Sequence, residues 1–592
     1  MKPTMVYSVL AMTALSTTLT TAAFATGNQC GPAFSSQLQN NVSESLMTSA
    51  TAMSHTLRGH IPAVVKAMND QGSVSGSQQL SVTVALQLNN EAGLDAAIEA
   101  MYNPNSSTYH QFLTTEQFVA QFAPTTAQVA AEKAFLESQG IAVQDVSENN
   151  MFIHATGSIA ALNAAFKTEV HKYVGRSGKE YFAPAYDVQA PANSRISAVI
   201  GLSNTAVLHN HLAKKPAPKA GPEGTAPGGG LAPADIRTAY GVPANLNGAG
   251  QTLALFELDG FKAANITAYE KQFKLAATPL KTVLIDGASA TPSSQGGEPE
   301  VELDIELMIA LAPKATQIVV YEGPNSSAGL IDTYAKIASD NTAKQISSSW
   351  GEAETSAAAS DMQSENTIFK QMVAQGQSLF SAAGDSGAED DGSTVSVDDP
   401  SGQPYVVAVG GTKMVISSAA KWTSETTWNE LTSQEGAGGG GISTVWSIPS
   451  WQTGITADTQ ASKKMRNVPD VSLNADPETG YGIYFTDTSS GSTAAQWAPI
   501  GGTSAAAPLW AAFNALVNQN RIAKGLTTTG FLNPALYALG AGSNGATDFH
   551  DIADGSNNGN STGSFKATKG YDNATGWGSF QATSLLNDLS AK

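Results

Sequence analysis

Hydrophobic positions in the first third of the chain alternate between the spacing typical of strands and the spacing typical of helices. A strand-like run covers residues 80–86 and an amphipathic helical stretch covers residues 94–101. A second unit of the same kind follows, with a helix, a strand and a helix at 132–139, 151–154 and 159–166. The pattern predicts a compact α+β domain of the split βαβ, ferredoxin-like kind over residues 26–211.

Longer apolar runs mark the C-terminal part of the chain, from residue 231 to residue 592. Residues 252–256 and 317–321 read as buried strands, and residues 301–311 read as a helix between them. Buried strands that alternate with helices are typical of a parallel sheet covered on both faces. We therefore expect an α/β domain here, with the glycine-rich stretch 436–441 as a surface loop.

Between these two parts lies a segment rich in proline and glycine, residues 212–230. Such a composition cannot bury a core, so we expect an exposed linker. Two interpretations stay open, a plain tether between domains and a site of proteolytic processing.

The first 25 residues have the form of a secretory signal peptide. Lys2 precedes a short apolar run, and small residues lead to an Ala-Phe-Ala pattern that ends at Ala25. This predicts export, to the outside of the cell or to the periplasm. No later run approaches the roughly 20 apolar residues of a membrane span, so we expect no membrane anchor.

Composition narrows the classes of partner and the sources of stability. The formal net charge of −19 makes nucleic acid an unfavourable partner. Cys30 is the only cysteine, so the chain forms no internal disulfide. An exported protein of this size then needs another source of stability, and a bound metal ion is one candidate.

A serine that enters a helix is the first candidate for chemistry. Ser504 follows a pair of glycines and precedes a helix-forming stretch with small neighbours. N–H groups at a helix N-terminus suit developing negative charge, so Ser504 is a candidate nucleophile. The alternative is an ordinary helix cap.

A nucleophilic serine needs a base, and histidine is the usual one. Seven of the eight histidines precede residue 230, which leaves only His550 in the α/β domain. Its neighbours lack the glycines and the hydrophobic helix expected around a catalytic histidine of the subtilisin type. A Ser-His-Asp enzyme is therefore disfavoured.

Carboxylates are the other source of a base. In the acidic stretch 298–308, Glu300 and Asp304 share one helix face, and Glu302 and Glu306 share another. Adjacent carboxylates resist double ionisation and can share a proton at low pH. Spacing alone does not choose between the pairs, and a solvated acidic face is the alternative.

A further carboxylate, Asp385, lies in a glycine-flanked loop directly after the strand-like residues 378–380. Loops at the carboxyl ends of strands carry the ligand-facing groups of α/β folds. An ordinary Asp-Ser-Gly turn is the alternative.

Taken together, Gly-Thr-Ser-Ala-Ala-Ala-Pro at 502–508, Glu-Val-Glu-Leu-Asp-Ile-Glu at 300–306 and Gly-Asp-Ser-Gly-Ala at 384–388 resemble the sedolisins, or serine-carboxyl peptidases. Residues 109–114 resemble part of the activation domain of the pro-kumamolisin type in that family, and residues 231–237 resemble the start of its catalytic domain. The resemblance implies a subtilisin-like α/β fold for 231–592 and a propeptide in 26–211.

The resemblance also implies roles for individual residues. Ser504 would be the nucleophile, Glu300 its general base, and Asp304 the partner that orients Glu300, which leaves Glu302 and Glu306 as bystanders. Asp385 would donate a hydrogen bond to the oxyanion, which requires its protonated form and so links activity to acid. Glu257 and Trp350 resemble residues that extend the proton network, with a strand-end charge and a packed aromatic as the alternatives.

One structural calcium ion is also expected from the resemblance. Its ligands would be the carboxylates of Asp551 and Asp572 and the backbone carbonyls of Ile552, Thr568 and Gly570, all in loops that offer the hard oxygen atoms calcium prefers. Asp554 could replace one of the two aspartates.

The implied activity is acid endoproteolysis of proteins and peptides by a self-processed zymogen whose propeptide inhibits it. Two other classes stay open. One is a subtilisin-type neutral serine protease, and the other is a secreted, calcium-stabilised binding protein without catalysis.

Overall fold

The computed structural model describes residues 54–214, 224–455 and 460–591. The predicted signal peptide and Cys30 lie outside these residues. Residues His55–Lys592 belong to one compact unit, which contains both predicted domains.

The N-terminal part is built on a four-stranded antiparallel sheet. The strand order is β4 (Ala142–Val146), β5 (Phe152–Ser158), β3 (Gln79–Leu86) and β9 (Ile196–Ile200). Helices α2 (Glu91–Tyr102), α4 (Thr126–Ser138) and α5 (Ile159–Phe166) connect and cover it. This is the ferredoxin-like arrangement, so the predicted fold class is confirmed. Helix α4 begins earlier than predicted because Thr125 and Gln128 form a capping box at its N-terminus.

Smaller elements complete this part of the chain. A three-stranded sheet contains β2 (Asn69–Ser73), β6 (Val170–Val174) and β7 (Glu180–Pro184), β1 (Ser54–Leu57) pairs with β8 (Val188–Pro191), and α3 (Thr115–Phe122) follows α2.

The C-terminal part is organised around an eight-stranded sheet. Its order is β13 (Leu280–Leu284), β14 (Gln317–Glu322), β12 (Thr252–Glu257), β15 (Gln345–Ser348), β17 (Ser378–Ala382), β19 (Val407–Ile416) and β20 (Trp422–Thr427), with β23 (Val471–Asn474) also paired to β19. All pairs are parallel except that of β19 with β20. The continuous apolar strands are buried on both faces, as the sequence predicts.

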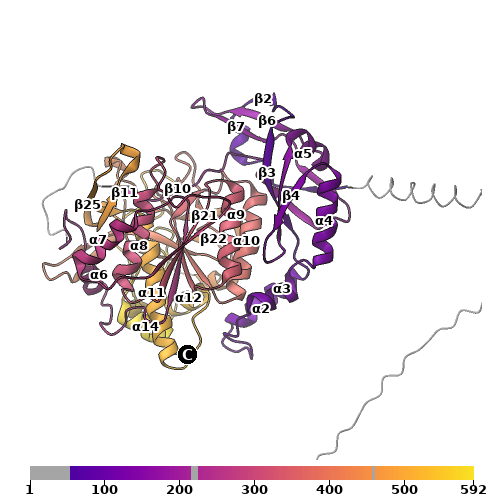
Figure 1. Ribbon diagram of the computed structural model, residues 1–592. Coiled ribbons are helices and arrows are strands. Elements are labelled where there is room, and N and C mark those ends of the chain that lie inside the picture. Colours follow the sequence, from indigo (N-terminus) through magenta and orange to yellow (C-terminus); the bar gives the residue numbers. More distant parts are fainter. Residues whose placement is uncertain (1–53, 215–223, 456–459, 592) are drawn as a thin grey trace, which may run out of the picture. The chain divides into compact units, whose positions relative to one another are not determined.

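Helices cover both faces of this sheet (Figure 1). On one face, α8 (Glu298–Leu311) packs against α11 (Thr503–Ala523), and on the other α9 (Ser327–Asp340) packs against α10 (Ala359–Ala374). All 14 residues of α8 are buried, so the alternative of a solvated acidic face is wrong. The remaining helices are α6 (Pro233–Ala239), α7 (Ala263–Phe273), α12 (Asn533–Gly540), α13 (Gly545–Asp548) and α14 (Ala582–Leu589).

Short strands lie around the edges of the large sheet. They are β10 (His209–Asn210) with β16 (Trp350–Ala353) and β18 (Asp398–Asp399), β11 (Ala213–Lys214) with β25 (Ala495–Gly501) and β24 (Tyr481–Thr486), β21 (Gly441–Ser447) with β22 (Met465–Val468), and β26 (Phe549–His550) with β27 (Ser579–Phe580).

One prediction about loops is wrong, and another falls largely outside the described residues. Of the expected linker at 212–230, residues 215–223 are not described; at its ends β11 pairs with β25, and Ala226 is buried whereas Lys214 and Thr225 are exposed. The glycine-rich stretch 436–441, expected as a surface loop, is mostly buried. A Cβ built on Gly439 would lie 1.8 Å from the Ala383 carbonyl oxygen, so the missing side chains permit this close packing.

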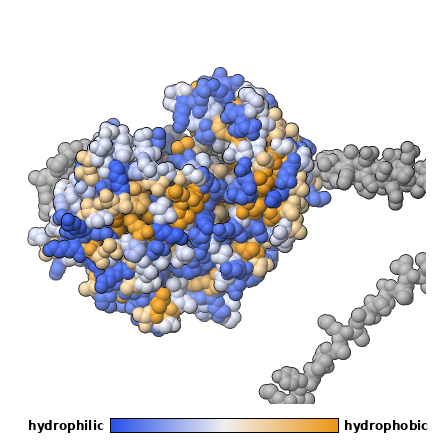
Figure 2. Space-filling view, in the orientation of Figure 1, coloured by the Kyte–Doolittle hydropathy of each residue, from blue (hydrophilic) through white to orange (hydrophobic). Residues whose placement is uncertain are grey.

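Polar and apolar residues are interspersed over the surface in view in Figure 2, where apolar residues form separate small patches. Among the described residues, no helix combines the length and the apolar character that crossing a bilayer requires.

Candidate active site

The candidate nucleophile lies at the first turn of α11. Gly502 precedes this helix with φ of 98°, a conformation that favours glycine, and Ser504 is fully buried. The Ser504 hydroxyl donates a long hydrogen bond of 3.4 Å to the backbone carbonyl of Ser349.

Glu300 and Asp304 lie one turn apart on α8, which packs directly against α11. Ser349 connects the two helices, because its Oγ lies 2.9 Å from both Asp304 carboxylate oxygens and 3.3 Å from the Ser504 carbonyl oxygen. Sequence analysis did not single out Ser349. Its only signal is its position next to Trp350.

Burial raises the pKa of Glu300 well above its ordinary value. Among the described residues, no donor is aligned well enough to form a hydrogen bond with either Glu300 oxygen. The Ser504 and Ser349 hydroxyls nevertheless lie close enough to lower the pKa of Glu300. Burial also raises the pKa of Asp304, and the Glu257 and Glu300 carboxylates raise it further. The cluster therefore retains protons, with hydroxyl groups placed to stabilise the ionised form of Glu300.

The two further network candidates contact each other. The Trp350 indole N–H donates to Glu257 Oε2 at 2.8 Å. Burial raises the pKa of Glu257 to about 8, and its hydrogen bonds with Trp350 and Asp304 oppose that rise. Glu257 and Trp350 are therefore in direct contact, and the Asp304 carboxyl group lies beside Glu257.

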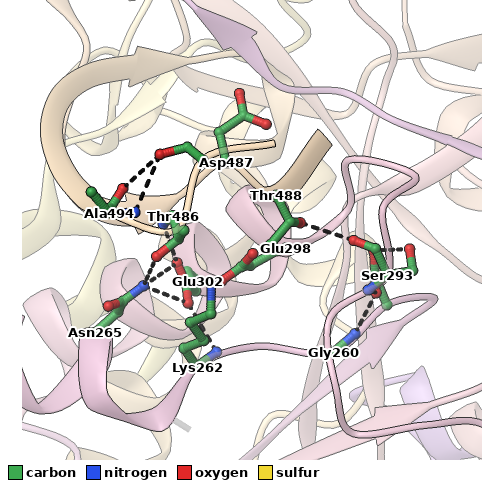
Figure 3. Close-up of polar contacts among 12 residues, drawn as sticks. Gly260, Lys262, Asn265, Ser293, Glu298, Glu302, Thr486, Asp487, Thr488 and Ala494 are labelled. Atoms are coloured by element: carbon green, nitrogen blue, oxygen red, sulfur yellow. Dashed lines mark hydrogen bonds and ion pairs between the residues drawn. The ribbon is translucent and has the colours of Figure 1, made fainter. Parts of the chain in front are cut away.

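The second acidic pair on α8 has other partners, and Figure 3 shows those of Glu302. Glu302 accepts hydrogen bonds from the Asn265 side-chain amide and from the backbone N–H groups of Lys262 and Thr486. Glu306 accepts one from the backbone N–H of Tyr484 at 2.9 Å. These carboxylates join α8 to neighbouring segments, whereas Glu300 lies near Ser504 of α11 and Asp304 binds Ser349.

Asp385 reaches the start of α11 from the loop after β17. Its Oδ1 accepts hydrogen bonds from the backbone N–H and the hydroxyl of Thr503, both at 2.8 Å. Burial is the main cause that raises its pKa to about 6. The loop is fixed from behind, since the Ala437 N–H donates to the Asp385 carbonyl at 2.9 Å. The buried glycine-rich stretch thus positions this carboxylate.

His550 lies elsewhere, stacked on Trp422 with ring centroids 4.0 Å apart. Burial lowers its pKa to about 4. Among the described residues, the Ser504 hydroxyl has no histidine side chain as a hydrogen-bond partner, and the carboxylates of α8 are its acidic neighbours.

The five expected calcium ligands come from two loops that lie close together. The Gly570 N–H donates to both Asp551 carboxylate oxygens, at 3.1 and 3.0 Å, and the Thr568 N–H donates to Asp572 Oδ2 at 2.8 Å. Within the described part of the chain, the backbone carbonyls of Ile552, Thr568 and Gly570 accept no hydrogen bond. Free carbonyls beside two carboxylates fit a hard divalent cation. The Asp554 carboxylate accepts hydrogen bonds from the backbone N–H and the hydroxyl of Ser556 in its own loop.

A second acidic group has a different explanation. Glu430, Asp476 and Glu478 gather their carboxylates around the Lys413 ammonium, at 2.5, 2.9 and 2.8 Å. This ammonium already supplies the positive charge that a metal ion would bring.

Comparison with known proteins follows the same division of the chain. A model for the pro-kumamolisin activation domain matches residues 66–205, and a model for the subtilase family matches residues 295–535.

Curated relatives match over most of their length. Kumamolisin of Bacillus sp. (strain MN-32) is 35% identical over 520 residues, which cover 85% of this chain and 90% of the relative. Sedolisin of Pseudomonas sp. (strain 101) is 32% identical, with coverage of 82% and 83%. The solved structure of Pseudomonas sedolisin, complexed with two molecules of pseudo-iodotyrostatin, aligns with a TM-score of 0.55 at 29% identity and covers 62% of this chain and 100% of that one.

The subtilisin-like fold, the activation domain and these relatives point to one family. This chain belongs to the sedolisin family of serine-type peptidases and carries that family's pro-kumamolisin activation domain.

Proposed function

We infer that the protein is an exported, acid-acting serine-carboxyl endopeptidase that is made as a self-processed zymogen. Ser504 is the nucleophile, Glu300 its general base, Asp304 the carboxyl group that orients Glu300 and holds a proton, and Asp385 the oxyanion donor. The observation that carries this proposal is the connection of Ser504 to Asp304 through Ser349, with the Ser504 and Ser349 hydroxyls close enough to Glu300 to affect its pKa, and all four residues are buried.

The proposed mechanism follows from which carboxyl groups of the site hold a proton and which is ionised. Ser504 Oγ attacks the substrate carbonyl carbon while its proton passes to Glu300, whose ionised form the neighbouring hydroxyls favour. Asp304 and Glu257 hold protons through burial and mutual contact, which keeps the charge of the cluster low.

Oxyanion stabilisation is assigned to Asp385. Its Oδ1 is occupied by the two Thr503 donors, so a proton on Oδ2 can be donated to a developing oxyanion. This role requires the neutral carboxyl group, which is the major form below a pH of about 6.

Four segments make up the proposed precursor. They are a signal peptide at 1–25, an inhibitory propeptide at 26–211, a processing region at 212–230 and the peptidase at 231–592. One calcium ion, held by Asp551, Asp572 and the carbonyls of Ile552, Thr568 and Gly570, would fix the two C-terminal loops and stabilise the peptidase without taking part in the reaction.

Digestion of a denatured protein across pH 2 to 8 tests the proposal. Wild-type zymogen incubated in acid should lose its propeptide and cleave only in acid, whereas Ser504→Ala should do neither. Glu300→Gln should lose activity, and Glu302→Gln is the matched control on the same helix that should keep it. A neutral optimum, or activity in Ser504→Ala, would contradict the proposal.

A further inference from the structure

The motif at 109–114 belongs to an aromatic arm, residues 102–114, which runs from the last residue of α2 to the cap of α3 and contacts the C-terminal part of the chain. The Tyr102 hydroxyl donates to the Val373 carbonyl at 2.8 Å and accepts from the Phe531 N–H at 2.8 Å. Val373 lies in α10, and Phe531 follows α11. One phenol hydroxyl of the arm therefore binds two separate segments of the C-terminal part.

The Phe112 ring of the arm fills a gap that two glycines leave. A Cβ built on Gly376 would lie 2.4 Å from the Phe112 ring, and a Cβ built on Gly530 would also lie 2.4 Å from it. Because either methyl group would displace the ring, the two glycines form a socket for one aromatic side chain. Beside the socket, the Leu113 N–H donates to the Ala374 carbonyl at 2.9 Å. The arm is therefore held by a packed ring and by hydrogen bonds to the backbone.

The socket lies at the end of the sheet opposite to the candidate active site. Gly376 comes two residues before β17, whereas Asp385 follows that strand. Gly530 comes after α11, which carries Ser504 in its first turn, and a helix of 21 residues spans about 30 Å. The arm therefore binds the C-terminal part far from Ser504, and cutting the chain near Ser504 removes none of these contacts.

One contact of the arm requires a neutral histidine. His110 Nδ1 lies 3.1 Å from Arg521 Nη2, near the C-terminus of α11. A guanidinium group has only donors, so Nδ1 accepts this hydrogen bond and carries no proton. A protonated imidazole has no acceptor, and it would bring a second positive charge next to the guanidinium. Protonation of His110 therefore breaks this contact and repels the arm from α11.

The groups around His110 keep its ring neutral at neutral pH. Burial and the Arg521 charge lower the pKa of His110 to about 4. Tyr109 and Tyr102, with ring centroids 3.9 and 6.3 Å from that of His110, have pKa values that burial raises, so both stay uncharged. Asp588 is the carboxylate that lines the same cavity, which has a volume of about 300 Å³. His110 is only half-buried, so protons from the solvent can reach it.

The sign of the pH effect follows from the pKa of His110 in the contact and away from it. The ordinary pKa of histidine is 6.5, and the contact lowers it to about 4. Binding therefore favours the neutral form, so the affinity of the arm is complete above pH 6.5 and falls as the pH drops from 6.5 to 4. Because the ring is half-buried, we expect about a 10- to 100-fold loss of affinity between pH 7 and pH 4.

We propose that the arm is a clasp that keeps the propeptide bound to the peptidase after the chain is cut, and that the clasp opens in acid when His110 takes up a proton beside Arg521. This inference rests on the proposed function, and it adds the surface that retains the propeptide and the event that releases it. Acid then has two effects, since it frees the peptidase and protonates the oxyanion donor Asp385.

The test uses the whole chain, cut in place at neutral pH. The parent protein carries Ser504→Ala, and a recognition sequence for a neutral, sequence-specific protease replaces residues 216–222, so the cut requires neither acid nor Ser504. Sedimentation velocity over a series of concentrations then gives the dissociation constant of the two pieces at each pH from 7 to 4. Other contacts between the pieces, such as that of His154 with Asp332 at 2.8 Å, are common to all variants.

Three variants separate the socket from the histidine. His110→Gln offers Arg521 an acceptor at every pH, so its dissociation constant should match that of the parent at pH 7 and be about 10- to 100-fold lower than that of the parent at pH 4. Phe112→Ala should raise the dissociation constant by about 10- to 100-fold at both pH values. His171→Gln is the matched control, because His171 contacts Asp70 within the N-terminal part, and it should change neither value.

Two results would overturn this inference. One is the same pH dependence of the dissociation constant in His110→Gln and in the parent, and the other is an unchanged dissociation constant in Phe112→Ala. If circular dichroism shows that Phe112→Ala does not fold, Tyr102→Phe, which removes only the hydroxyl, should raise the constant by about 5- to 50-fold, and no change would count against the clasp. These outcomes leave the proposed function standing, because every protein in the test lacks the nucleophile. The proposed function fails separately, if wild-type zymogen digests no protein in acid.

Discussion

Replacing Asp385 with asparagine separates the need for a hydrogen-bond donor from the need for a carboxyl group. Asparagine keeps an oxygen that can accept the two Thr503 hydrogen bonds, and it places an NH₂ group at the position of Oδ2. That NH₂ group donates at every pH. Asp385→Ala, in contrast, removes the donor altogether.

The size of the effect follows from the pKa of about 6. The pKa is raised, so the donor form is present below that value and is lost as the pH rises through it. About a tenth of the wild-type enzyme keeps the donor one unit above its pKa. Loss of one oxyanion donor typically costs about 10²- to 10³-fold in kcat, so Asp385→Ala should lose that factor in acid. Asp385→Asn should stay within about tenfold of the wild type in acid and exceed it above pH 7.

The assay is kcat/KM for a quenched fluorescent peptide from pH 3 to 8. Each variant is first freed of its propeptide by a trace of wild-type enzyme, and Ser504→Ala treated in the same way gives the blank. If Asp385→Asn loses as much activity as Asp385→Ala at every pH, then Asp385 does not act as a hydrogen-bond donor. The reasoning would also be refuted if kcat/KM of Asp385→Asn declined near pH 6 in the same way as that of the wild type.

Three other predictions concern backbone geometry, buried charge and metal. Gly502→Ala should abolish self-processing without unfolding the protein, because its methyl group would lie 2.0 Å from the His211 carbonyl oxygen and 2.8 Å from Asp385 Oδ2, beside Ser504; normal processing, with folding checked by circular dichroism, would contradict this. Burial raises the pKa of Glu322 to about 8, so its ionisation destabilises the fold as pH rises from its ordinary value of 4.5. Glu322→Gln should therefore raise Tm at pH 8, by the equivalent of about a few kcal/mol, and leave Tm at pH 4 unchanged. An equal shift of Tm at the two pH values would contradict the raised pKa of Glu322. EGTA should lower the Tm of the wild type and of the control Asp554→Asn, but not that of Asp572→Asn, and a Tm insensitive to calcium in all three would argue against the site.

Much of this architecture is readable from local patterns. The strands at 80–86, 252–256 and 317–321 and the helices at 159–166 and 301–311 were predictable because apolar spacing reports which side of an element is buried. The start of α4 was missed, since a capping box outweighed weak periodicity. The buried glycine-rich stretch 436–441 was also missed, because composition does not show which backbone will pack against it.

The sequence by itself singled out the proposed reactive groups, since Ser504, Asp385 and the acidic helix stand in motifs that local chemistry and family resemblance mark. Only the tertiary structure decided how they meet. It brought Glu300 near Ser504 and Asp304 to Ser349, turned Glu302 toward Asn265, and laid His211 beside Asp398, 187 positions away along the chain. Those outcomes depend on the packing angle of two helices and on the path of a distant strand, and no local pattern of residues encodes either one.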